Sequence, residues 1–89
     1  MKNKNINNLK ESNNSTFHIL PNPSTGIFKI STAEIFDKIE VTNIIGRSFN
    51  AIQINDNQYS ISELPSGLYI VSLIKDGKKL GSRRLMKIE

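Results

Sequence analysis

Hydrophobic and polar residues alternate along short stretches of this chain, with a period that predicts β-strands rather than helices. The clearest case is residues 38–42, where Ile39 and Val41 alternate with polar side chains. This pattern is typical of a strand with one face on a core and the other in water. Residues 17–20, 26–30 and 58–61 predict three further short strands.

The second half of the chain adds a longer apolar run. Residues 68–74 are apolar on both faces, which predicts a central strand. Asp76-Gly77 follows as a type I′ hairpin signal, and residues 79–88 predict the last strand. In residues 47–54 the apolar phase slips, which predicts a bulged strand. Six or seven short strands without a helical segment predict a small all-β fold, an antiparallel β-sandwich.

Residues 1–16 differ in composition from the rest of the chain. They are rich in Asn, Ser and Lys, and we expect a disordered lead-in, because such a segment cannot offset the entropy of ordering. They also lack the apolar run of a secretory signal peptide. Residues 17–89 then form the single domain predicted here, which is too small to leave much volume for a deep cleft.

Composition argues against several kinds of chemistry. The 89 residues include no Cys, which excludes disulfides, thiolate nucleophiles and Cys-ligated zinc. His18 is the one His, and it has no partner at metal or triad spacing. The eight carboxylates are scattered, so no acid–base pair can be argued. We therefore predict no catalytic, cofactor-binding or metal-binding residues and no enzyme activity.

Three glycine-centred turns, each followed by an apolar strand, divide the chain. They are Pro21-Asn22-Pro23 with Gly26, then Gly46-Arg47, then Pro65-Ser66-Gly67 with Tyr69. Each one alone is ordinary turn chemistry, since Pro fixes φ and Gly reaches backbone angles that other residues resist. Their order and spacing, ahead of a basic C-terminal strand, are more specific than any one of the turns alone.

In that order the turns resemble the type A C-terminal sorting domain of the Bacteroidetes type IX secretion system, the Por secretion system family. The resemblance covers about residues 17–87. The positions that match the family's motifs are Pro21, Asn22, Pro23, Gly26, Gly46, Arg47, Pro65, Gly67, Tyr69 and Lys87.

The resemblance implies an immunoglobulin-like sandwich that acts as a secretion signal. Such a domain follows a covalently attached cargo protein and is recognised in the periplasm by components of the type IX translocon. A sortase-like peptidase then cleaves before the folded domain. The cargo crosses the outer membrane and is either joined to anionic lipopolysaccharide at the cell surface or released. The cargo itself is not part of this sequence, and an excised fragment, a mis-started gene product and a free-standing domain all stay open.

The basic residues near the C-terminus have two interpretations. Lysines on an edge strand often prevent edge-to-edge pairing. Under the resemblance they also form a candidate recognition surface for the secretion machinery. Lys78, Arg83, Arg84 and Lys87 are expected to be exposed charges, so reversing their sign should abolish export and leave the fold intact. The residues of the whole surface are Lys78, Lys79, Arg83, Arg84 and Lys87.

Two other functions compete with a secretion signal. A small nucleic-acid binder would need exposed aromatic rings beside the basic cluster, whereas the aromatic residues fall at predicted core positions, so we predict no nucleic-acid partner. The stronger alternative is an immunoglobulin-like extracellular adhesion or carbohydrate-binding module. It would need an exposed aromatic platform, so burial of Phe28, Phe49 and Tyr69 would count against it.

Overall fold

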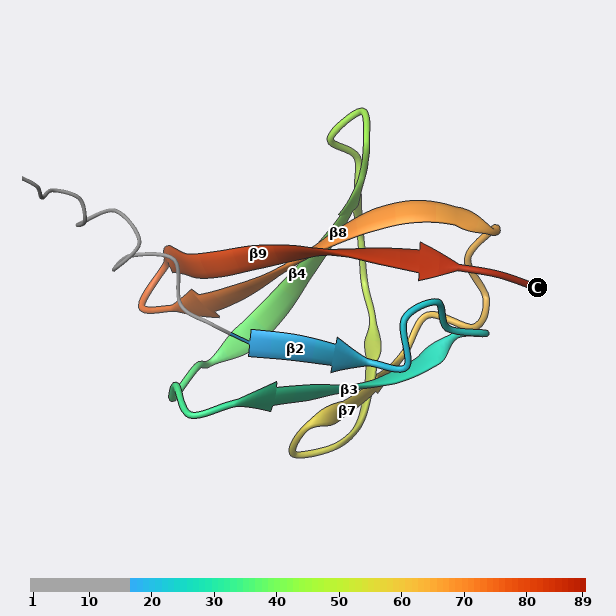
Figure 1. The fold of residues 1–89 in the computed structure, drawn as a ribbon. Helices are drawn as coiled ribbons and strands as arrows, with labels where there is room; N and C mark the ends of the chain where they lie inside the picture. The colour runs from blue at the N-terminus through green and yellow to red at the C-terminus, as the bar shows by residue number, and fades with distance from the viewer. Residues whose placement is uncertain (1–16) are drawn as a thin grey trace, which may run out of the picture.

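The computed structural model describes residues 17–89, so the expected lead-in of residues 1–16 lies outside the described residues. Within this range the chain forms eight strands and no helix, and the predicted β-sandwich is confirmed (Figure 1). No helix in this part of the chain could span a membrane. The strands are β2 (Phe17–Leu20), β3 (Ile27–Thr32), β4 (Lys38–Asn43), β5 (Ser48–Phe49), β6 (Ile52–Asn55), β7 (Gln58–Ser60), β8 (Gly67–Lys75) and β9 (Lys78–Lys87).

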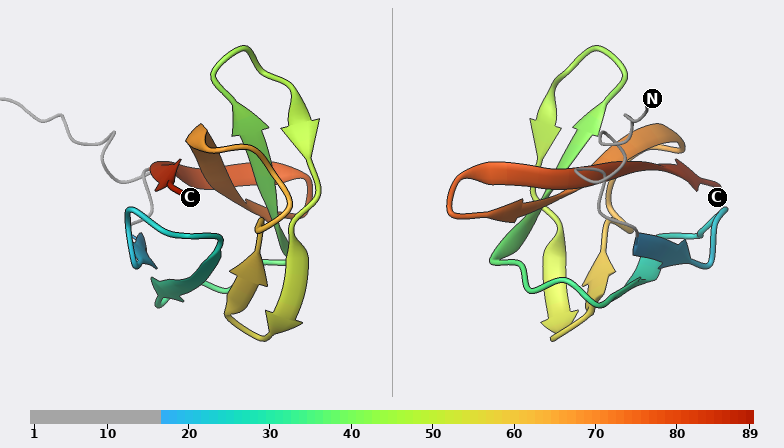
Figure 2. Two further views of the ribbon diagram at one scale, coloured as in Figure 1. Left: turned by 90° about the vertical axis from the view of Figure 1, so that its right-hand side faces the viewer. Right: turned by 60° about the vertical axis from the view of Figure 1, so that its left-hand side comes forward.

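The strands form two four-stranded antiparallel sheets. One sheet has the order β2-β3-β7-β6 and the other β5-β4-β8-β9, and the two views of Figure 2 show them packed against each other. Apolar residues from both inner faces fill the space between the sheets, as in other sandwiches. The buried core contains Phe17, Ile19, Phe28, Ile30, Val41, Tyr59, Ile61, Tyr69, Val71, Leu73 and Leu85.

The bulged strand predicted for residues 47–54 is instead two strands in different sheets. The chain leaves one sheet after Phe49 at the end of β5 and joins the other at Ile52 in β6. The chain changes sheet at this point, and the two isoleucines of β6 do not face the core, because Ile52 and Ile54 are both exposed. A register shift also occurs further along, between Gln53 and Asn55 where β6 pairs with β7.

The prediction for the β8–β9 hairpin is confirmed. β8 is a central strand, hydrogen-bonded to β4 on one side and β9 on the other. At the turn, Asp76 has φ of 52° and Gly77 has φ of 79°, and a type I′ turn requires positive φ at both of these positions. Lys75 and Lys78 pair directly across the hairpin.

The two sheets meet along one side of the sandwich, where β2 lies beside β9. Here the Arg83 Nε donates a hydrogen bond of 3.0 Å to the Phe17 carbonyl oxygen. The Arg83 guanidinium also lies 5.6 Å from the centre of the Phe17 ring. The Arg83 side chain therefore holds Phe17, at the start of β2, against β9.

Candidate functional site

The Pro21-Asn22-Pro23 segment is hydrogen-bonded to the end of β9. Asn22 Nδ2 donates to the Arg84 carbonyl oxygen at 2.9 Å, and the Met86 amide donates to Asn22 Oδ1 at 3.1 Å. A single side chain amide thus satisfies one acceptor and one donor of the terminal strand, as a neighbouring strand would.

Ser24 continues this attachment with its backbone. Its amide donates to the Met86 carbonyl oxygen at 2.9 Å, and its carbonyl oxygen accepts from the Ile88 amide at 2.8 Å. Ser24 and Lys87 form an isolated parallel bridge. The Ser24 hydroxyl accepts from the Gly26 amide and donates to the Ile27 carbonyl oxygen, both at 2.9 Å. Residues 22–24 therefore cover the outer edge of β9, and we call this arrangement the locked turn.

Gly26 is the last residue of the locked turn, and this position has room only for glycine. Its φ is +138°, and a Cβ at this position would lie 2.5 Å from Ser62 Oγ and 2.7 Å from Ser62 Cα. The Gly26 carbonyl oxygen also accepts a 2.7 Å bond from the Ile61 amide. Close approach of two backbones, together with a positive φ, requires glycine.

The third predicted turn meets the same end of β9 from the other side. Gly67 pairs with Lys87, and Tyr69 pairs with Leu85. The Tyr69 hydroxyl donates to the Pro65 carbonyl oxygen at 2.6 Å, which fixes the loop before β8. The last residues of β9 are consequently held between β8 and the locked turn, and two of the three sequence motifs converge on Lys87.

Lys87 itself corrects one expectation from the sequence. It was expected to be an exposed charge, but only 6% of its surface is accessible. It occupies the same phase of β9 as the fully buried Leu85, two residues earlier, and so belongs to the inner face. Within residues 17–89 its ammonium has no carboxylate or hydrogen-bond partner.

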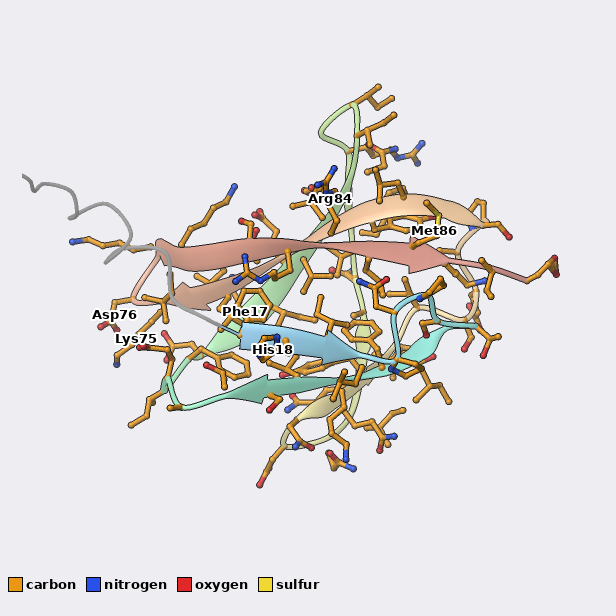
Figure 3. The ribbon with its side chains drawn as sticks, viewed as in Figure 1. Phe17, His18, Lys75, Asp76, Arg84 and Met86 are labelled. Carbon is orange, nitrogen blue, oxygen red and sulfur yellow. The ribbon has the colours of Figure 1, made fainter. Side chains whose placement is uncertain are left out.

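The other basic residues do not form one patch. Arg84 and Met86 lie on the face of β9 away from β2, whereas Arg83 reaches back to Phe17 (Figure 3). Lys79 forms a 3.6 Å ion pair with Glu40 of β4. Lys78 is exposed next to the β8–β9 turn, at the opposite end of β9 from Lys87. The five residues of the candidate recognition surface are therefore spread over the length and both faces of β9.

The remaining motif, Gly46-Arg47, lies apart from the locked turn. It belongs to the β4–β5 hairpin, which projects from the sandwich at the top of Figure 1 and of both views in Figure 2. At its apex Ile44 and Ile45 are 71% and 83% exposed. Sequence reasoning assigned no role to these two residues, although a pair of β-branched residues before a turn glycine was the available signal.

No group of three or more His, Cys, Asp or Glu side chains in residues 17–89 could hold a metal ion. Burial raises the pKa of Tyr59, and the nearby Asp56 carboxylate adds to the effect. Phe28 and Tyr69 are buried and Phe49 is half-buried, so these three rings do not form the exposed platform that a carbohydrate-binding module requires.

The chain matches a known protein family over the range that contains the three glycine-centred turns. Residues 18–87 match the model of a protein family described as the secretion system C-terminal sorting domain. The matched range runs from β2 to the end of β9 and includes all three glycine-centred turns. A search of curated proteins found no match.

Proposed function

This chain belongs to the secretion system C-terminal sorting domain family, and from that premise we propose that residues 17–89 act as a folded export signal for an attached cargo. The family is associated with the type IX secretion machinery and with export to the cell surface or beyond it. In our proposal the translocon reads the folded domain in the periplasm, and the cargo then crosses the outer membrane.

We also propose where the cargo is cleaved from the domain. A sortase-like peptidase would cleave before Phe17, because the chain from that residue onward is paired in β2 and the Phe17 side chain is fully buried. Proteases act most easily on segments whose backbone is neither buried nor hydrogen-bonded. The cargo would then be joined to anionic lipopolysaccharide or released.

One observation carries the proposal: the motif residues converge on the end of β9. The locked turn and the start of β8 hold residues 84–88 as a fixed strand. We therefore propose that the machinery recognises a folded surface and not a free C-terminal peptide. A preformed surface binds at a lower entropic cost than a segment that must first be ordered.

The test fuses the full chain behind a reporter that carries a signal peptide, in a bacterium with a working type IX system. We expect the reporter on the cell surface or in the medium, with its C-terminus trimmed to a position before Phe17 when measured by mass spectrometry. A reporter without the domain should stay periplasmic. If the fused reporter also stays there, while the same reporter with an established sorting domain is exported, the proposal is wrong.

A further inference from the structure

The tip of the β4–β5 hairpin is held rigid by one residue. Asn43 donates its amide to the Arg47 carbonyl oxygen and accepts from the Gly46 amide, both at 3.0 Å. Its side chain Oδ1 accepts from the Ile45 amide at 3.1 Å and from the Arg47 amide at 2.9 Å. Gly46 follows with φ of +89°. Four hydrogen bonds thus fix the backbone of a tip that makes no contribution to the core.

This rigid tip presents apolar side chains to solvent. Ile44 and Ile45 are adjacent at the apex and largely exposed. Turn apices usually carry Asn, Asp, Gly or Ser, and β-branched residues there gain nothing from the fold. Ile35 is comparably exposed, at 76%, but it stands alone in the loop between β3 and β4 and has Glu34 and Asp37 close by in sequence.

The charge around the tip is positive. Between Glu40 and Asp56 the chain has no acidic residue, and Arg47 is the single charged residue in that interval. The Arg47 guanidinium lies 5.5 Å from the centre of the Phe49 ring, and within residues 17–89 it has no carboxylate partner. Stacking on a ring leaves the edge of the guanidinium open to a bidentate acceptor.

We propose that the tip of residues 44–47 docks into an apolar pocket of a protein in the secretion machinery, with a carboxylate at the rim of that pocket bound by Arg47. The inference rests on the proposed function. A rigid tip with two adjacent apolar anchors suits a preformed pocket, because little freedom is lost on binding. A lipid surface fits less well, since stable membrane attachment takes more apolar area or a cluster of basic residues.

The export assay with the full chain tests the docking directly. The double variant Ile44→Ser/Ile45→Ser should lower the exported fraction of the reporter by about tenfold or more, as expected for loss of two buried anchors. Ile35→Ser is the matched control, because it removes an equally exposed isoleucine elsewhere, and it should export like the wild type. Arg47→Glu should lower export most, and Arg47→Lys should retain only part of it, because an ammonium keeps the charge but cannot bind a carboxylate through two parallel hydrogen bonds.

The outcomes separate this inference from the proposed function. If the wild-type fusion is exported and the tip variants are exported equally well, the docking inference is wrong and the proposed function stands. If the wild-type fusion is not exported, both fail. The thermal midpoint of each purified variant should match that of the wild type, and a midpoint lowered enough to account for the export defect would overturn the inference.

Two binding measurements on the purified chain examine other partners of the tip. Sedimentation with vesicles of anionic phospholipid and lipopolysaccharide should give no binding that depends on Ile44 and Ile45. Analytical ultracentrifugation should give the same mass for the wild type and the double variant. Vesicle binding or self-association that the double variant loses would instead assign the tip to a lipid surface or to a second copy.

Discussion

The locked turn and the β4–β5 hairpin are both organised by an asparagine and a glycine. The asparagine of the first forms long-range hydrogen bonds, and that of the second forms local ones. Asn22 bonds to Arg84 and Met86, residues more than 60 positions away, and so joins two distant parts of the chain. Asn43 bonds to its own turn, two and four residues ahead. Ser24 in the first region is 1% exposed, whereas Ile45 in the second is 83% exposed.

The motif residues of the two regions therefore differ in what they contribute to the protein. Those of the locked turn stabilise the fold and hold β9 in place. Those of the hairpin present side chains and contribute little to the core. Substitutions in the two regions should therefore separate loss of folding from loss of recognition, and the free energy of unfolding is the quantity that distinguishes them.

The largest contrast is expected between the two glycines. Gly26→Ala should destabilise the domain by about 3 kcal/mol or more, because it combines a positive φ with a clash against the Ser62 backbone. Gly46→Ala should cost about 1 to 2 kcal/mol, since a Cβ there has nothing within 4 Å and only the backbone angle is strained. Urea denaturation of both variants measures the two values.

If both glycine variants lose the same stability, the two regions do not differ in their constraint. Equal losses would mean that Ser62 moves aside without cost and that the locked turn is no more constrained than the hairpin. Ser62→Gly serves as the control, because it removes the Oγ and Cβ that Gly26→Ala would meet but leaves the Cα in place.

The next largest effect concerns the lysine at the centre of the locked end. Lys87→Glu should lose about 2 to 4 kcal/mol, because the shorter glutamate side chain would hold its carboxylate in a position where only 6% of Lys87 is accessible, away from water. Lys87→Met keeps the length of the side chain and should retain most of the stability. Arg84→Glu, on the outer face, should change stability by less than about 0.5 kcal/mol. Thermal unfolding of the three variants gives the order.

Export of the Lys87→Met fusion tests whether the charge of Lys87 has a role beyond stability. If a stable Lys87→Met domain loses export, the machinery reads the ammonium through a rearrangement of the locked end. If export is unchanged, Lys87 is part of the core and the family position is structural. A Lys87→Glu variant as stable as the wild type would show that the side chain reaches solvent, against its 6% exposure.

Local patterns predicted the elements of this fold well, because strands and two-residue hairpins are coded by nearby residues. Asp76-Gly77 specified its turn, and the run from Leu68 specified a central strand. The contact of Asn22 with β9 carried no local signal, since its partners lie across the sequence. Lys87 was misplaced because its charge was given more weight than its phase relative to Leu85.

The two asparagines should differ in a smaller and more local effect. Asn22→Ala removes both side chain bonds to β9 and should cost about 1 to 2 kcal/mol, because these bonds lie at an exposed edge where water partly replaces them. Hydrogen exchange of the Met86 amide should quicken. Asn43→Ala should instead quicken exchange at Ile45 and Arg47 and leave Met86 unchanged. Faster exchange at Met86 in both variants would mean that the regions are coupled.

The smallest effect is a dependence of stability on alkaline pH that belongs to the sheet of the locked turn. Tyr59 stacks on Phe28 of β3, two residues after Gly26, with ring centroids 6.0 Å apart. Burial raises the pKa of Tyr59 above the ordinary tyrosine value of 10.0, because the folded state favours the neutral phenol. The resulting stability is present in full below pH 10 and is lost as the pH rises through the higher pKa of the folded state. The thermal midpoint should therefore fall more steeply above pH 10 in the wild type than in Tyr59→Phe. Identical slopes for the two proteins would show that the Tyr59 phenol ionises without cost, and that this sheet is looser around the locked turn than its buried residues indicate.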